Sequence, residues 1–221
     1  LTAAAAMDAD AVLLGHTRDD QAETVLLGLA RGSGPRSLSG MAPRAGLLRR
    51  PLLELPRDVV HAAASVCAPT LGLDPWQDPH NVDPSFTRVR VRQAALPALE
   101  REIGPGVSAA LARTAALVRD DTDALDAWAR SESDRCVRAG ADGAVVVDAA
   151  ALSSLPRAVR TRVLRAAACA SGAPASDLRH SHVLALDALV MQAAVGAVAD
   201  LPRVDAIRRD GVLRLQRRAA R

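Results

Sequence analysis

The chain has 221 residues, of which 49% are hydrophobic, 24% charged and 1% aromatic, and its formal net charge is +3. This length allows one large or two small domains, and the scarcity of aromatic residues means that Leu, Val and Ala must form the core. All 28 basic residues are arginine. A pI near 9.3 permits a nucleic-acid partner without requiring one.

The cysteines and the hydropathy pattern exclude several classes of protein. Cys67, Cys136 and Cys169 are widely spaced and form no Cys-x-x-Cys pair, which argues against a disulfide framework or a zinc clip. We therefore expect reduced thiols in a cytoplasmic protein. No stretch reaches the roughly 18 apolar residues of a membrane helix, so we expect no membrane partner. Residues 1–6 lack the basic start of a signal peptide, and a first residue other than Met suggests a partial chain.

The most informative stretch is polar and lies between a predicted strand and a predicted helix. Residues 11–14 form a short apolar run typical of a buried strand, and residues 20–30 follow a helical pattern. Ligands of open α/β sheets bind at the carboxyl ends of the strands. The free amides and the dipole at the start of a helix favour phosphate at the same place.

An imidazole and three carboxylates occupy this junction. His16 ends the strand, and Asp19, Asp20 and Glu23 follow at spacings that place acids on a shared helix face. One interpretation is a Mg²⁺ site, since carboxylate oxygens suit this ion. The other is helix capping, with Asp19 or Asp20 as the cap and Glu23 completing a capping box. Capping and catalysis can coexist.

A glycine-rich segment follows this helix. Gly32 is predicted to be a left-handed C-cap, and Pro35 blocks continuation of the helix. The segment Arg31, Gly32, Ser33 and Gly34 then has two interpretations, which its spacing leaves equal. It is either a simple helix stop or a flexible loop whose N–H groups approach phosphate.

Residues 15–24 and 31–34 resemble the second signature of the tRNA(Ile)-lysidine synthases. That pattern is a His pair, one residue, Asp-Asp, two residues, Glu-Thr, and then Arg-Gly-Ser/Thr-Gly. His16 matches the first His, whereas Thr17 stands where many members carry the second. The resemblance favours a phosphate-approaching loop for residues 31–34. It implies an ATP-pyrophosphatase fold and modification of the wobble cytidine of a tRNA.

A turn-rich loop and a basic segment extend the resemblance to about residue 102. Asp78, Asn81 and Asp83 match the family's Asp-x-x-Asn-x-Asp loop. Arg88 and Arg92 match the arginines of its Arg-Asn-x-x-Arg helix start, which precedes Leu-Pro.

Within that helix start, Val89 replaces the usual Asn, so one polar contact is lost or supplied elsewhere. In a helix, Arg88 and Arg92 share one side and Arg90 lies about 160° away. One side can then meet phosphate or RNA while the other pairs with the acids of the loop. The alternative is a solvated basic face.

The predicted fold class is α/β, with two domains. Residues 1–103 would be the C-terminal part of a PP-loop catalytic domain, a partial doubly wound parallel sheet of the adenine-nucleotide α-hydrolase type. Gly104-Pro105-Gly106 marks the boundary. Residues 107–221 would be an α-helical tRNA-binding domain that ends in a β-hairpin. In the first domain we expect a strand at 47–53 and a helix from Pro56 to about residue 71.

The second domain is expected to contain one long and two shorter helices. Their ranges are 107–131, 156–172 and 181–195, with an extended segment at 144–148. A hairpin follows over residues 203–216, because Asp210-Gly211 is a type I′ turn signal. Ser153 or Ser154 is expected to cap the second helix. Its arginines at 157, 160 and 165 form either an RNA-facing stripe or a soluble face.

The resemblance implies substrates and residue roles. ATP would adenylate the C2 oxygen of the wobble cytidine in tRNA(Ile) with the CAU anticodon, and lysine would then displace AMP. Mg²⁺ would be held by Asp20 with Glu23 beside it, and His16 would contact nucleotide phosphate. Nucleotide and RNA would be positioned by Arg31, Gly32, Ser33, Gly34, Arg88, Arg90 and Arg92.

The family's first signature, a Ser-Gly-Gly-x-Asp-Ser loop that binds ATP phosphates, is absent from these residues. We therefore expect the 221 residues alone to be inactive. Three alternatives remain: another PP-loop enzyme such as a tRNA thiolase, a non-catalytic RNA-binding fragment, and a metal-dependent phosphohydrolase. Thiolases that use catalytic thiols or clusters would show paired cysteines, and the phosphohydrolase would need further His ligands. The sequence leaves the oligomeric state open, a homodimer included.

Overall fold

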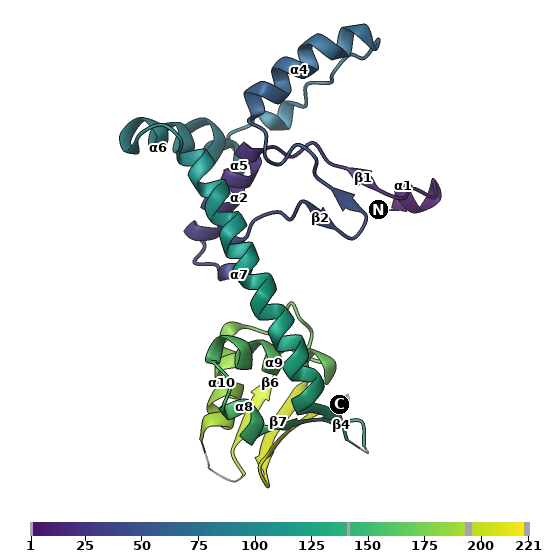
Figure 1. Ribbon diagram of the computed structural model, residues 1–221, viewed down its shortest axis with the longest axis vertical. Helices are drawn as coiled ribbons and strands as arrows, with labels where there is room; N and C mark the ends of the chain where they lie inside the picture. Colours follow the sequence, from purple (N-terminus) through teal and green to yellow (C-terminus); the bar gives the residue numbers. More distant parts are fainter. Residues whose placement is uncertain (1, 141, 193–195, 219–221) are drawn as a thin grey trace. The chain divides into compact units, whose positions relative to one another are not determined.

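The computed structural model describes residues 2–140, 142–192 and 196–218 (Figure 1). The chain packs as two compact units, Leu1–Thr122 and Asp123–Arg221. The sequence boundary at residues 104–106 instead marks the start of a long helix, α7 (Val107–Cys136), whose first half packs within the first unit. Among the described residues, no helix is both long and apolar enough to span a bilayer.

A small mixed sheet lies in the first unit. Strand β1 (Val12–Leu13) pairs in parallel with β3 (Leu48–Arg49), and β2 (Arg44–Ala45) pairs antiparallel with β3. Strands were predicted at both places, and both observed strands are shorter. For β3 the reason is Pro51, which begins a turn two residues after the strand ends. A parallel strand pair with intervening helices confirms the predicted α/β class.

The helices of the first unit include those predicted at residues 20–30 and 56–71 and at the helix start 88–92, and short ones at 35–38 and 79–81 that were not predicted. They are α1 (Thr2–Ala6), α2 (Arg18–Ala30), α3 (Pro35–Leu38), α4 (Arg57–Thr70), the 3₁₀ turn η1 (Pro79–Asn81), α5 (Thr87–Arg90), the π-helical turn η2 (Val91–Ala95), α6 (Leu96–Ile103) and α7. Gly32 adopts the predicted left-handed conformation, with φ +63°, directly after the C-cap of α2. Pro69 lies in the last turn of α4, which ends one residue later, as expected for a proline.

The start of α7 is capped from outside the helix. The Glu100 carboxylate accepts hydrogen bonds from the backbone N–H groups of Gly106, Val107 and Ser108, at 2.6, 3.1 and 2.8 Å. These bonds, led by the one from Ser108, hold the pKa of Glu100 below its usual value. This cap satisfies amides that the first turn of a helix leaves without partners.

Apolar side chains of α2, η2, α6 and α7 form the core of the first unit. Ala22, Val91 and Leu96 are buried at its centre. The Gln21 side chain of α2 donates to the carbonyl of Met41 at 3.0 Å and accepts from its N–H at 2.7 Å. The residue before Met41 is Gly40, which has φ +61°. The loop between α3 and β2 is therefore fastened to α2 by one buried amide.

We expect Gly40→Ala to destabilise the first unit by about 1–3 kcal/mol. A Cβ at this position would lie 2.5 Å from Oε1 of Gln21, and the positive φ disfavours any side chain. The measurement is denaturant unfolding of the protein with Gly46→Ala as the control. Gly46 also has positive φ, but a Cβ there meets nothing within 4 Å. Equal losses for both variants would show that the contact with Gln21 is unimportant.

The second unit is built on a five-stranded antiparallel sheet of order β4-β5-β8-β7-β6. The strands are β4 (Val137–Ala139), β5 (Val145–Asp148), β6 (Val198–Leu201), β7 (Val204–Arg209) and β8 (Val212–Arg217). The predicted hairpin is β7–β8, and Asp210 and Gly211 have the positive φ angles, 50° and 77°, of the predicted turn. The sheet extends beyond the predicted hairpin, since β5 lies at its interior next to β8.

Helices α8 (Ala149–Ser153), α9 (Arg157–Ala170) and α10 (His180–Met191) pack against this sheet (Figure 1). The predicted end of the last helix, at residues 193–195, lies outside the described residues. The predicted serine cap of α9 is wrong. Pro156 occupies the N-cap, and the hydroxyls of Ser153 and Ser154 donate back to carbonyls of α8.

The three arginines of the predicted stripe on α9 differ in their exposure. Arg160 is buried and donates to the Asp187 carboxylate at 2.5 and 3.4 Å. Arg157 lies 3.6 Å from the same carboxylate, and Arg165 donates to the carbonyls of Ala175 and Leu178. Because Arg160 is buried, the three arginines do not form one exposed stripe, although 65% of the Arg157 side chain is exposed.

Candidate functional site

The amino end of α2 is closed by a capping box. Thr17 is the N-cap, and its N–H and hydroxyl both donate to Oδ2 of Asp20 at 2.8 Å. Sequence analysis placed the cap at Asp19 or Asp20 and the closing acid at Glu23. The box is instead formed by Thr17 and Asp20, which stand three residues apart as the motif requires. Thr17, at the position of the family's second His, therefore has a structural role here.

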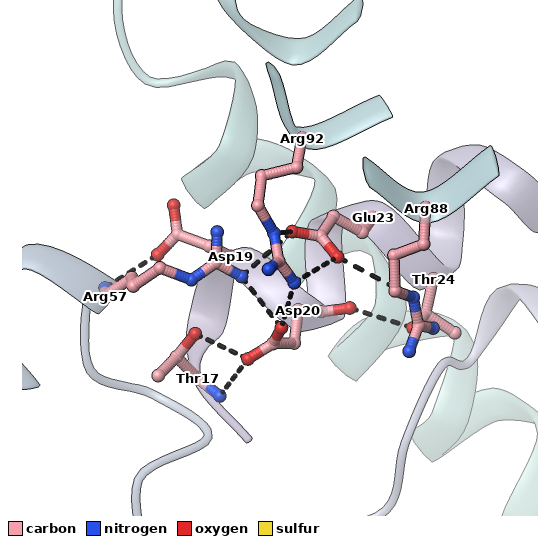
Figure 2. Close-up of polar contacts among 8 residues, drawn as sticks. All are labelled: Thr17, Asp19, Asp20, Glu23, Thr24, Arg57, Arg88 and Arg92. Carbon is pink, nitrogen blue, oxygen red and sulfur yellow. Dashed lines mark hydrogen bonds and ion pairs between the residues drawn. The ribbon is translucent and has the colours of Figure 1, made fainter. Parts of the chain in front are cut away.

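Two arginines from distant segments bind the acids of α2 (Figure 2). The Arg57 guanidinium donates to Oδ1 of Asp20 at 2.7 Å and to Oε1 of Glu23 at 2.9 Å. The Arg92 guanidinium donates to both oxygens of Glu23, at 2.7 and 3.1 Å, and to Oδ1 of Asp20 at 3.2 Å. The Glu23 side chain has no exposed surface. A buried carboxylate is thus neutralised from two sides by planar, forked donors.

The remaining members complete a charge-balanced cluster (Figure 2). Asp19 accepts from the backbone N–H of Arg57 at 2.8 Å, which fixes the first turn of α4. Arg88 lies 3.6 Å from Oε2 of Glu23 and donates to the Thr24 hydroxyl at 2.9 Å, with 44% of its side chain exposed. We call the set Asp19, Asp20, Glu23, Arg57, Arg88 and Arg92 the acid–arginine cluster. It joins α2 to the start of α4 and to the α5–η2 segment.

Arg90 points away from this cluster, as the helical spacing predicted. Its guanidinium donates to the carbonyls of Pro84 and Ser85 and to the Thr87 hydroxyl. The helical spacing left open which side would pair with the acids of the preceding loop, and the Arg90 side chain instead binds backbone carbonyls and a hydroxyl. The carbonyls lie within reach because the chain turns back directly before α5.

The acids of that loop bind their own chain. Asp78 accepts from the N–H of His80 at 2.9 Å, and Asp83 accepts from the N–H of Ser85 at 2.8 Å. These backbone hydrogen bonds lower the pKa of each carboxyl. The loop is thus held by local turns.

Acidification should remove the stabilisation that Asp20 provides. Burial alone would raise the pKa of Asp20, but hydrogen bonds from Thr17 and the nearby Arg57 outweigh it and lower the pKa. A carboxyl whose pKa is lower in the folded state stabilises the fold above its unfolded pKa, about 4. This contribution is lost as the pH falls through the folded pKa. We expect the difference in unfolding free energy between wild type and Asp20→Asn to be constant near neutral pH and to shrink below about pH 4.

The control for this titration is Asp10→Asn, an exposed aspartate without a hydrogen bond among the described residues. Chemical unfolding is measured over a pH series for all three proteins. A wild-type advantage over Asp20→Asn that grows on acidification would contradict the assignment.

The cluster does not fit the predicted magnesium ligand. Both oxygens of Asp20 already accept hydrogen bonds, one from Thr17 and the other from two guanidinium groups. Among residues 2–140, 142–192 and 196–218, no group of three His, Cys, Asp or Glu side chains could hold a metal ion. A divalent cation at Asp20 would also face the positive charges of Arg57 and Arg92.

His16 lies apart from the acids with which sequence analysis grouped it. Its Nδ1 accepts from Nε of Arg50 at 3.2 Å, so it contacts the residue after β3. Both residues follow strands that run in parallel, which places them at the same edge of the sheet. The strand ends at Leu13, so His16 lies in the connection to α2 rather than at the predicted strand end, and its hydrogen bond is to Arg50 rather than to Asp20 or Glu23.

The segment after α2 behaves as a helix stop. The N–H groups of Arg31 and Ser33 donate to the carbonyl of Gly28, and that of Gly32 donates to Leu29. These three amides are therefore not free to bind phosphate. Gly34 is the N-cap of α3. Asp20 and Arg31 stand near opposite ends of α2, about 16 Å apart along its axis, so the segment does not join the cluster.

Sequence analysis missed Arg57 and Arg50. Arg57 directly follows Pro56 at the start of α4, and that position gave no sign that its side chain reaches α2. Arg50 lies inside the strand predicted at 47–53, but it follows the observed β3, as His16 follows β1. This shared position at parallel strand ends was the available signal.

Comparison with known proteins agrees with this geometry. A family model described as a PP-loop domain matches residues 1–99, so the first unit carries a domain of this class. Over 194 residues the chain is 57% identical to the tRNA(Ile)-lysidine synthase of Thermobifida fusca, covering 88% of this chain and 57% of that protein. The chain is thus similar, over most of its length, to proteins named tRNA(Ile)-lysidine synthase.

Two further relatives carry the same name. The protein of Leifsonia xyli is 48% identical over 212 residues, which are 96% of this chain and 62% of that protein. The protein of Streptomyces coelicolor is 50% identical over 212 residues, which are 95% of this chain and 58% of that protein. The chain therefore spans about three fifths of the length of these curated relatives.

Proposed function

We propose that the complete gene product is a tRNA(Ile)-lysidine synthase. The observation that carries this proposal is 48–57% identity to proteins of that name over most of the chain. The substrates would be ATP, lysine and tRNA(Ile) with the CAU anticodon. The three cysteines are free thiols, which agrees with a reducing, cytoplasmic compartment. We also keep the domain assignment, 1–103 catalytic and 107–221 tRNA-binding, as part of this proposal.

The reaction has two balanced steps. The C2 oxygen of the wobble cytidine attacks the α-phosphorus of ATP, and pyrophosphate leaves. The lysine ε-amine then attacks C2, the C2–O bond breaks, AMP leaves and the amine loses a proton. Each step moves negative charge onto phosphate, so fixed positive groups near the phosphates would lower the barrier.

The acid–arginine cluster supplies such groups in this proposal. Arg88 is half exposed, and its position between Glu23 and Thr24 suits it to contact nucleotide phosphate. The hydrogen bonds to Glu23 raise the pKa of Arg92, so its guanidinium stays charged throughout the reaction. Asp20 and Glu23 would hold these guanidinium groups in place. His16 and Arg50 would contact phosphate from the strand edge, whereas Arg90 would position the loop before α5.

The test is lysine transfer by the complete gene product. It is incubated with ATP, labelled lysine and a tRNA(Ile) transcript that carries CAU. We expect one AMP and one pyrophosphate for each lysine attached to the tRNA. Pyrophosphate release without attached lysine, or sulfur transfer when a sulfur donor is added, would instead favour another PP-loop enzyme.

A further inference from the structure

Two adjoining clefts of the first unit lie outside the acid–arginine cluster. Their volumes are about 470 and 380 Å³, and Pro43, Leu53 and Glu54 line both. Apart from these three shared residues, the polar side chains that line the two clefts are arginines and one glutamine. We call the two clefts together the basic groove; its arginines are Arg18, Arg44, Arg49, Arg50, Arg113 and Arg119.

The groove is lined by six arginines and by one carboxylate. Its one carboxylate, Glu54, forms no ion pair among the described residues. Arg49 donates to the carbonyls of Gly46 and Leu48, which carry no net charge. In the acid–arginine cluster, by contrast, three guanidinium groups meet three carboxylates. Arg44 and Arg113 have no acidic partner among the described residues, and cations gathered in a concave surface focus a positive potential there.

Several of these guanidinium groups retain free donors. Arg44 and Arg113 are exposed and form no hydrogen bond or ion pair through their side chains within the described part of the chain. Nε of Arg18 is buried and has no hydrogen-bond partner there either. A buried donor without an acceptor costs free energy, and a ligand with acceptor oxygens would remove that cost.

The lining also indicates which part of a ligand would bind. The groove contains arginine, proline, alanine, leucine, glutamine and glutamate, and no aromatic side chain on which a base could stack. Guanidinium groups bind phosphate oxygens through paired N–H donors. Six arginines spread over two clefts exceed what one phosphate needs. They suit a series of phosphates along a strand.

We propose that the basic groove binds the phosphodiester backbone of the RNA substrate without reading its bases. This inference rests on the proposed function for the choice of RNA as the polyanion. Phosphate contacts of this kind set the position of the nucleic acid and make the affinity depend on salt.

The test measures binding of a short RNA hairpin with a CAU loop to the complete gene product over a salt series. The test variant is Arg44→Gln with Arg113→Gln, because both side chains are exposed and without partners, so the fold should be kept. We expect about tenfold weaker binding and a fall of about 1.5 in the salt slope, since each phosphate contact contributes about 0.7–0.9. Circular dichroism checks the fold.

The matched control is Arg31→Gln with Arg101→Gln. Both are exposed arginines of the first unit that do not line the groove, and their removal lowers the net charge equally. An unchanged slope in the test variant, or an equal fall in the control, would overturn the inference. So would weakened binding of ATP or pyrophosphate by the test variant with RNA binding intact, because the groove would then be a nucleotide site.

The proposed function can fail separately. If the wild-type protein attaches no lysine but the salt slope falls as expected, the groove still binds RNA and only the reaction is wrong. If lysine is attached and the slope is unchanged, the groove assignment alone is wrong.

Discussion

Asp187→Ala should destabilise the second unit by about 3–5 kcal/mol, because it leaves a buried guanidinium without its carboxylate. Asp187 accepts from Arg160 at 2.5 Å, and the two side chains are only 12% and 8% exposed. Arg160 also donates to the carbonyl of Leu155, so it cannot simply swing into solvent. Denaturant unfolding gives the free energy, and hydrogen exchange should place the loss in α9 and α10.

Two further variants define the cause of that loss. Asp134→Ala removes an exposed aspartate of the same unit and should leave the unfolding free energy nearly unchanged. Arg160→Met combined with Asp187→Leu replaces the pair by apolar side chains and should recover most of the lost stability. If Asp187→Ala unfolds like wild type, the buried pair is not a stabilising contact.

Glu23→Gln should be the most damaging single substitution in the first unit, with a loss of about 3–5 kcal/mol. The carboxylate is fully buried and accepts three hydrogen bonds from Arg57 and Arg92. A neutral amide keeps the shape but turns N–H donors towards guanidinium donors. Hydrogen exchange should increase in α2, at the start of α4 and in η2, the three segments that the cluster joins.

The control for this variant is Glu102→Gln, whose side chain is 69% exposed and pairs with Arg101 at 2.7 Å. We expect no measurable change in stability from an exposed pair of this kind. Lysine transfer by the complete gene product should also fall in Glu23→Gln, since Arg88 and Arg92 lose their anchor. Stability and transfer both equal to wild type would exclude the cluster from either role.

Patterns within one segment predicted the fold well. The apolar run at residues 11–14, the glycine after α2 and the Asp-Gly turn each depend on neighbouring residues, and each was found where expected. Strand β6 was missed because a four-residue strand leaves too short an alternation to detect. The same limit left open whether residues 144–148 form a strand or an extended link, and their place as the interior strand β5 was not predicted.

The candidate site was predicted in its residue types but not in its pairing. Asp20 and Glu23 share a face of α2, as their spacing required, and Arg88 and Arg92 share a side of the α5–η2 segment. Sequence spacing cannot show that these two faces meet, because they are separated by more than 60 residues along the chain and the contact depends on packing. For that reason the sequence favoured Mg²⁺ as the partner of Asp20 and Glu23. In the structure their partners are the guanidinium groups of Arg57 and Arg92.

A double-mutant cycle on Glu23 and Arg92 tests most directly whether arginines hold the acids of this junction. Unfolding free energies are measured for wild type, Glu23→Gln, Arg92→Met and the double variant. We predict a coupling energy above about 1.5 kcal/mol, as for closely paired charges with little exposure. A coupling below about 0.3 kcal/mol, the level at which separate substitutions simply add, would contradict the account.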